Sequence, residues 1–149
     1  MLIFKAINII TTLTRIIFGV VHHKMRAIKS KIENLASRIN APKEYLPTYG
    51  FSEDFAKPHI EVNDNEFHWV VVERGQELER RQTTDEKELL FWVFDSVTFE
   101  MATRLELENR NENEDFRIQL FKIQEELIGE INSDYSDRLN IKHRKLLNI

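Results

Sequence analysis

The chain has 149 residues, of which 42% are hydrophobic and 31% are charged, and it contains no cysteine. This length fits one domain, and the apolar content is sufficient for a core, which argues against a disordered chain. Without cysteine the chain has no disulfide framework, thiolate chemistry or cysteine-based metal site, and a reducing compartment is favoured.

The net charge of −4 is distributed unevenly along the sequence. No acidic residue precedes Glu33, whereas the first 32 residues carry six positive charges, so the sequence from Glu33 onward carries −10. The six basic residues are Lys5, Arg15, Lys24, Arg26, Lys29 and Lys31. Because an acidic body repels phosphate backbones, we expect it to bind no nucleic acid and to attract a basic protein instead.

Residues 1–24 form a hydrophobic, basic extension that differs from the rest of the chain. Its polar residues recur every three or four positions, so on a helix they form one narrow stripe. They are Lys5, Asn8, Thr12, Arg15, Gly19 and His22. Three interpretations stay open: a membrane-associated helix at the cytoplasmic face, a translation start at Met25, or a signal peptide, which the lack of a small-residue cleavage site disfavours.

Residues 25–149 are predicted to form a single domain. Ile28, Ile32, Leu35 and Ile39 recur at helical spacing and predict a short amphipathic helix. Three prolines and a glycine within residues 40–58 predict an irregular connection. Apolar side chains could pin this connection to the domain: Tyr45, Leu46, Tyr49, Phe51 and Phe55.

Residues 59–62, 67–74 and 76–83 predict a three-stranded antiparallel meander, because polar turns separate three apolar-containing segments. Tight turns at Asp64-Asn65 and Arg74-Gly75 would pair Val62 with Phe67, Ile60 with Trp69 and Val71 with Leu78, which places all six apolar residues on one side. The opposite side would carry His59, Glu61, His68, Val70, Val72, Arg74, Glu77, Glu79 and Arg81.

Three further helices are predicted after the strands. Thr83 and Glu86 suggest a capped start for the first, whose apolar stripe runs from Leu89 to Leu105. The second would bury Phe116, Leu120, Ile123, Leu127 and Ile131, and the third would begin after a cap at residues 132–134 and end near Leu147. Strands grouped before helices indicate an α+β fold in which the helices pack on one face of the sheet.

No constellation in the sequence predicts catalysis, a metal or a cofactor. His59 and His68 would lie on one side with Glu61, but His59 would face Val70, so the two rings would be diagonal and the ligand set thin. His143 is expected to be solvated, and the carboxylates of Glu77 and Glu79 would lie on a wet edge strand. The four glycines form no phosphate loop, and no nucleophile elbow occurs. A binding module is therefore favoured over an enzyme.

Several segments together resemble immunity protein family sixty-three: INAPKEYLPTYG, PHIEV, FHWVVVERGQELERRQTTDEKELLFWVFDSVTF and DFRIQLFKIQEELIGEI. The likeness covers about Ile28 to Arg138, and residues before Met25 lie outside it. Members are small bacterial proteins encoded beside polymorphic toxins. The resemblance implies a cytoplasmic protein that neutralises a cognate toxin domain, such as a basic nuclease, by stoichiometric occlusion.

We expect the toxin to contact the second side of the sheet and the tip of its hairpin. The residues concerned are His68, Val70, Val72, Arg74, Gln76, Glu77 and Glu79. Pattern leaves open that a helix covers this side, which would make Val70 and Val72 core residues. An alternative function is a membrane-tethered adaptor, with residues 1–24 as its only membrane contact and the acidic domain binding another protein.

Overall fold

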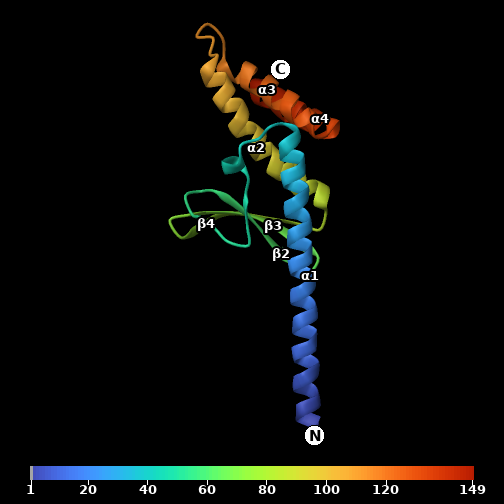
Figure 1. Cartoon of the computed structure of the whole chain (residues 1–149). Helices are drawn as coiled ribbons and strands as arrows, with labels where there is room; N and C mark the ends of the chain where they lie inside the picture. Colours follow the sequence, from blue (N-terminus) through green and yellow to red (C-terminus); the bar gives the residue numbers. More distant parts are fainter. Residues whose placement is uncertain (1) are drawn as a thin grey trace. The chain divides into compact units, whose positions relative to one another are not determined.

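The computed structural model describes the backbone from Leu2 and the side chains from Ile9 onward. Figure 1 shows the elements, whose order is α1 (Leu2–Arg38), η1 (Lys43–Tyr45), β1 (Thr48–Tyr49), β2 (Pro58–Asn63), β3 (Glu66–Glu73), β4 (Gln76–Thr83), α2 (Glu86–Glu108), α3 (Phe116–Gly129) and α4 (Ser133–Leu147). The predicted α+β class is confirmed, with four α-helices and one four-stranded sheet in the described chain.

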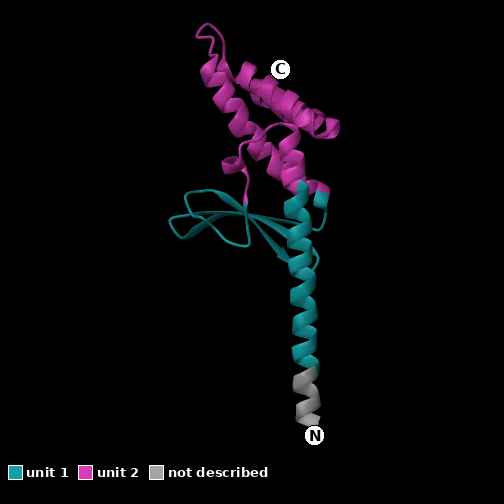
Figure 2. Cartoon of the chain, viewed as in Figure 1, with its two compact units in different colours: residues 1–31, 48–86 teal, residues 32–47, 87–149 magenta. Residues whose placement is uncertain are grey.

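The chain divides into two compact units, coloured separately in Figure 2. The first unit comprises Met1–Lys31 and Thr48–Glu86, and it contains the sheet with most of α1. The second comprises Ile32–Pro47 and Lys87–Ile149, and it contains α3, α4 and almost all of α2. The packing of three helices on one sheet face, and a single domain over residues 25–149, stay predictions.

The sheet has the strand order β1-β2-β3-β4, so the predicted three-stranded antiparallel meander was incomplete. β2, β3 and β4 pair antiparallel as predicted, but β1 adds a parallel strand beside β2, with Thr48 opposite His59. The Gly50 amide extends this contact by donating to the Ile60 carbonyl at 2.8 Å. A two-residue strand between Pro47 and Gly50 is too short to show alternation, which is why the segment reads as irregular.

The predicted register between β2 and β3 is confirmed at every pair. Val62 faces Phe67 and Ile60 faces Trp69, and all four side chains are buried. α1 lies along this side of the sheet, since the Lys24 ammonium is 4.1 Å from the centroid of the Phe67 ring. Burial of this apolar side therefore stabilises the first unit.

A β-bulge separates the two halves of β4, and it corrects the predicted pairing of Val71 with Leu78. Val72 faces Glu77 as expected, but Val71 faces Glu79 and Val70 faces Arg80, so Leu78 is the additional residue. Leu78 is 57% exposed instead of buried. An additional residue reverses the alternation beyond it. Glu79 and Arg81 therefore leave the side predicted for them, and Arg80 takes their place.

α1 is one continuous helix where the sequence suggested an extension followed by a short helix. Ile28, Ile32 and Ile39 of the predicted stripe are buried. Residues 9–20 are exposed, and the Lys5 and Asn8 side chains of the predicted polar stripe lie outside the described residues. Within the described chain, no helix combines the length and apolarity needed to cross a membrane.

The second unit is built on the apolar residues of α2. Leu89, Val93, Phe94 and Val97 are fully buried, which confirms most of the predicted stripe, whereas Leu105 at its end is exposed. α3 and α4 begin at the side-chain caps of Asp115 and Asn132. The buried face of α3 differs from the predicted one, because it consists of Leu120, Phe121, Gln124 and Ile128.

His143 belongs to the interior of the second unit, which corrects its predicted solvation. Its ring is buried and stacks on Phe121, with 3.9 Å between the ring centroids. Nδ1 lies 2.6 Å from Oε1 of Glu125. A second contact joins α4 to the beginning of α2, since the Tyr135 hydroxyl donates to the Lys87 carbonyl at 2.8 Å.

Candidate functional site

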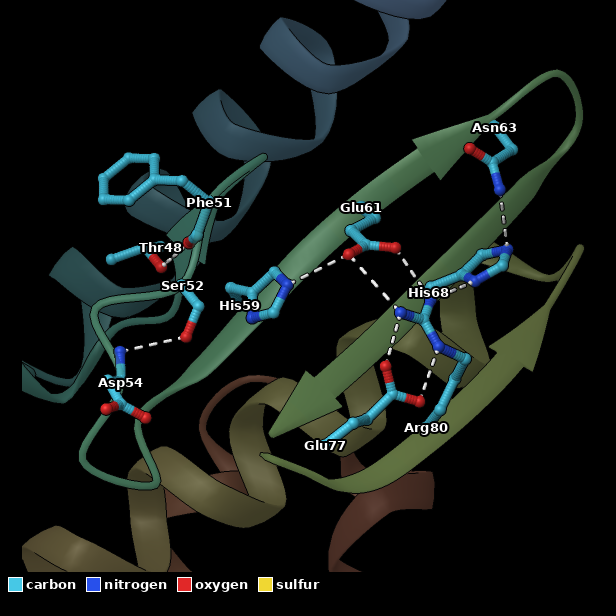
Figure 3. A network of polar contacts seen from close by, with 10 residues as sticks. All are labelled: Thr48, Phe51, Ser52, Asp54, His59, Glu61, Asn63, His68, Glu77 and Arg80. Carbon is cyan, nitrogen blue, oxygen red and sulfur yellow. Dashed lines mark hydrogen bonds and ion pairs between the residues drawn. The ribbon is translucent and has the colours of Figure 1, made fainter. Parts of the chain in front are cut away.

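A network of polar side chains occupies the second side of the sheet, with Arg80 of β4 at its centre (Figure 3). One guanidinium nitrogen, Nη1, donates to Oε2 of Glu61 at 2.7 Å and to Nδ1 of His68 at 2.8 Å. Nε and Nη2 donate to the two carboxylate oxygens of Glu77 at 2.9 and 2.8 Å. Arg80 thus joins all three strands of the meander.

The network depends on the register and on the bulge together. The β2–β3 register places Glu61 opposite His68. The bulge then places Arg80 opposite Val70, on the same side as Glu77 three residues earlier. In a regular strand, residues three apart point to opposite sides. The planar guanidinium can therefore bind both carboxylates, and the Glu77 contact is bidentate.

Arg80 keeps both carboxylates of the network ionised. Hydrogen bonds from Arg80 lower the pKa of Glu61, against an opposing effect of burial. Hydrogen bonds from Arg80 likewise lower the pKa of Glu77. The same contacts raise the pKa of Arg80, first through Glu77 and then through Glu61. With two carboxylates for one guanidinium, these three groups carry a net charge of −1.

His59 and His68 flank this network and are both buried. His59 Nε2 lies 3.1 Å from Oε1 of Glu61, while its Nδ1 is buried and has no hydrogen-bonding partner among the described residues. His59 faces Val70 as predicted, so the two imidazoles are diagonal. No group of three metal-ligating side chains gathers anywhere in the described part of the chain. The arrangement is suited to fixing strand geometry.

A loop beside the β3–β4 hairpin presents an aromatic side chain that was expected to pin the loop to the domain. Phe55 is 87% exposed. Asp54, Phe55 and Ala56 have φ angles of 63°, 57° and 59°, a left-handed conformation that costs about 1–2 kcal/mol per residue for L-amino acids. Aspartate tolerates this conformation, but phenylalanine and alanine do not favour it, so the sequence gives no signal for the turn.

Hydrogen bonds to the hairpin hold this loop in place. The Ala56 amide donates to the Val72 carbonyl at 2.9 Å, and the Gly75 amide at the hairpin tip donates to Oδ1 of Asp54 at 3.3 Å. Figure 3 shows a further contact within the loop, from the Asp54 amide to the Ser52 hydroxyl at 2.9 Å. The loop and the tip therefore form one surface. We call it the hairpin surface, and it consists of Asp54, Phe55, Arg74, Gln76 and Glu77.

The seven residues predicted to contact a partner are distributed over three environments. Arg74, Gln76 and Glu77 are exposed at the hairpin. His68 and Val70 are buried and Val72 is partly buried, so these three lie beneath the surface. Glu79 lies on the other side of the sheet, where its carboxylate accepts from Nε of Arg81 at 2.5 Å.

The sequence matches the model of a protein family described as immunity protein 63 over residues 63–145, which is more than half of the chain. The chain belongs to the immunity protein 63 family. No curated protein and no solved structure matches it. The match to the immunity protein 63 family begins at the last residue of β2 and ends within α4. It includes the hairpin and Arg80, whereas α1 and the loop that carries Phe55 precede it. The predicted family is thus confirmed, with residues 28–62 outside the match.

Proposed function

We propose that this protein is a cytoplasmic immunity protein that binds the toxin encoded beside its gene, one to one, and neutralises it by covering its surface without catalysis. The observation that carries the proposal is membership of the immunity protein 63 family. The charge supports it, because the −10 carried from Glu33 onward would attract a basic toxin domain, such as a nuclease, and accelerate association.

The hairpin surface is the proposed contact with the toxin. Phe55 is a large exposed aromatic held on a strained turn, and buried aromatic anchors contribute most of the affinity in protein interfaces. Glu77 and Asp54 add negative charge around it, which favours a basic partner. Backbone strain that the surrounding structure maintains is typical of functional positions.

The Arg80 network has a supporting part in this proposal. It joins Glu61 of β2 to Glu77 of β4 and so limits movement of the hairpin before the toxin arrives. A surface already fixed in its bound conformation loses less conformational entropy on binding. His68, Val70 and Val72 then support the contact from beneath, while Arg74 and Gln76 join it directly.

Co-expression with the adjacent toxin domain tests the function. We expect the protein to restore growth of cells that produce the toxin domain, and to form a 1:1 complex with it in size-exclusion chromatography with light scattering. Failure of rescue by folded, expressed protein would overturn the proposed function. Retained rescue without a complex would overturn the occlusion mechanism.

Binding measurements on variants test the surface separately. Truncating a central aromatic anchor costs about 2 kcal/mol or more, so Phe55→Ala should weaken toxin binding at least about 30-fold. The matched control is Phe116→Ala, which truncates an exposed phenylalanine on α3.

Glu77→Lys should weaken toxin binding more at low salt than at high salt. Glu79→Lys makes the same charge change on the other side of the sheet. Equal losses in Glu77→Lys and Glu79→Lys would exclude this surface as the contact.

A further inference from the structure

The first half of α1 has an apolar face that the rest of the first unit leaves uncovered. Ile9, Leu13, Ile16 and Val20 follow one another at intervals of four, three and four residues, so they form one line along the helix. Their exposed fractions lie between 52% and 60%. Each of these side chains therefore presents apolar surface to its surroundings.

A separate stripe of α1 accounts for the contact with the sheet. Val21 and Met25 are partly buried and Ile28 is 1% exposed, and this line is offset around the helix from the one through Val20. Past Val20 the exposed line continues with the polar residue His23, whereas Lys24 is partly buried and contacts the Phe67 ring. Packing within the unit thus explains the apolar residues of the second half of α1 and leaves those of the first half unexplained.

The exposed line lies at the end of the unit where the β2–β3 turn is found. Asp64 and Asn65 of this turn line an open hollow of about 220 Å³ together with Ile16, Ile17, Val20 and Val21. Figure 1 shows α1 continuing beyond the turn. An exposed apolar helix that projects from its unit is a contact surface, because contiguous apolar patches of this kind are rare on monomeric soluble proteins.

Charge identifies the partner of this face. The first 32 residues contain six basic residues and no acidic one. Arg15, His22 and Arg26 lie on the polar side of the helix, opposite the apolar line. A second copy of α1 could cover the apolar line but would leave the basic side without an acidic partner, whereas an anionic surface with an apolar interior satisfies both sides of the helix. The Asp64 carboxylate is the acidic group that lines the hollow, and the basic residues of α1 outnumber it.

We propose that the first half of α1 binds peripherally to a membrane surface that carries anionic lipid. The line from Ile9 to Val20 enters the boundary between headgroups and acyl chains, while Arg15 and Arg26 lie among the lipid phosphates. Amphipathic helices with a basic polar face bind bilayers in this orientation, and both apolar burial and electrostatic attraction contribute. The contact would hold the immunity domain at the membrane without requiring a spanning segment.

Vesicle co-sedimentation of the full chain tests this proposal. We expect at least tenfold stronger binding to vesicles with about 30% phosphatidylglycerol than to pure phosphatidylcholine, because basic segments bind anionic leaflets. Raising the salt to about 0.5 M should weaken this binding, since the Debye length shortens. Ile16→Asp with Val20→Asp should reduce it at least about tenfold, because charges are costly at the acyl boundary.

The matched control introduces the same charges at equally exposed apolar positions outside α1. Leu107→Asp with Ile141→Asp changes side chains that are 57% and 59% exposed, and it should leave vesicle binding unchanged. Equal binding to both vesicle types, or equal loss in the two double variants, would overturn the proposal. So would wild-type protein that stays off vesicles but dimerises through α1 in light scattering. Each variant should still form the toxin complex, which separates this result from a failure of the proposed function.

Discussion

Replacing Arg80 by methionine should destabilise the first unit measurably, because it removes the centre of the polar network. Arg80 makes hydrogen bonds to Glu61, Glu77 and His68, and only 29% of its side chain is exposed. Methionine retains most of the aliphatic stem but none of the donors. The two carboxylates are then left close together without their cation, and Nδ1 of His68 loses its donor within a buried ring.

The magnitude follows from the partial burial of these groups. Hydrogen bonds to charged groups contribute about 1.5–3 kcal/mol, and breaking a fully buried ion pair costs about 3–5 kcal/mol. Exposed ion pairs contribute only about 0–1 kcal/mol. Because the Glu61 side chain is about one-third exposed, the appropriate value lies between these limits. We expect Arg80→Met to lower the free energy of unfolding by about 1–2 kcal/mol.

Urea unfolding followed by Trp69 fluorescence measures this loss. Trp69 lies in β3, and a Trp92→Phe background removes the signal of the other unit. Arg81→Met is the matched control, since Arg81 pairs with Glu79 on the opposite side and is 41% exposed. It should cost less than about 0.5 kcal/mol. A neutral Arg80→Met, or an equal loss for Arg81→Met, would refute the stabilising role of the network.

Three further predictions concern pH and backbone conformation. The pKa values of Glu61 and Glu77 are lowered, so the stability that these carboxylates contribute is complete above the ordinary pKa of 4.5 and is lost as the pH falls through the lowered values. The difference in unfolding free energy between wild type and Arg80→Met, measured by urea titration, should therefore shrink between about pH 6 and about pH 3. Gly75 has a φ of +73°, so Gly75→Ala should destabilise the hairpin by about 1 kcal/mol, and an unchanged urea midpoint would contradict the strained turn. Phe55→Asn should raise the unfolding free energy by up to about 1 kcal/mol, because asparagine tolerates the left-handed conformation, while toxin binding falls; a loss of both would mean that Phe55 is structural.

The register of β2 and β3 could be predicted because two independent signals agree. The turn at Asp64-Asn65 and the alternation of apolar residues both pair Ile60 with Trp69. The helix cap at Asn132 could be predicted for the same reason, since a cap residue directly precedes a helical repeat, whereas the cap at Asp115 was not predicted. Local signals of this kind need no knowledge of tertiary packing.

The bulge in β4 could not be predicted, because charge does not distinguish the two possible registers. Arg80 and Arg81 are adjacent, so either register places one arginine on each side of the sheet. The residues beyond Leu78 all change sides between the two registers, but only Leu78 is apolar, and its apolar character suggested burial. The structure exposes Leu78 instead, and the Arg80 network forms on the second side as a result.

The exposed loop and the buried face of α3 show the limits of counting apolar residues. Phe55 was expected to pin its loop, but the hydrogen bonds from the Ala56 amide to the Val72 carbonyl and from the Gly75 amide to the Asp54 carboxylate perform that task. On α3, Gln124 replaces the predicted Ile123 in the buried face, because its amide nitrogen donates to both the carbonyl and the carboxylate of Asp95. The Gln124 amide oxygen is buried without a hydrogen-bond partner among the described residues, so only the amide nitrogen offsets the burial of this side chain. Polar residues held in the interior by such contacts are invisible to a hydrophobic repeat.

β4 is the terminal strand of the sheet, and its composition affects how other chains can approach it. Four of its eight residues are charged, and the bulge interrupts the even spacing of its free backbone amides and carbonyls. Both features discourage another strand from pairing with this edge. The protein should consequently resist edge-to-edge aggregation at high concentration. A partner that binds here must recognise side chains, since the strand offers no regular ladder onto which an extended peptide could be added.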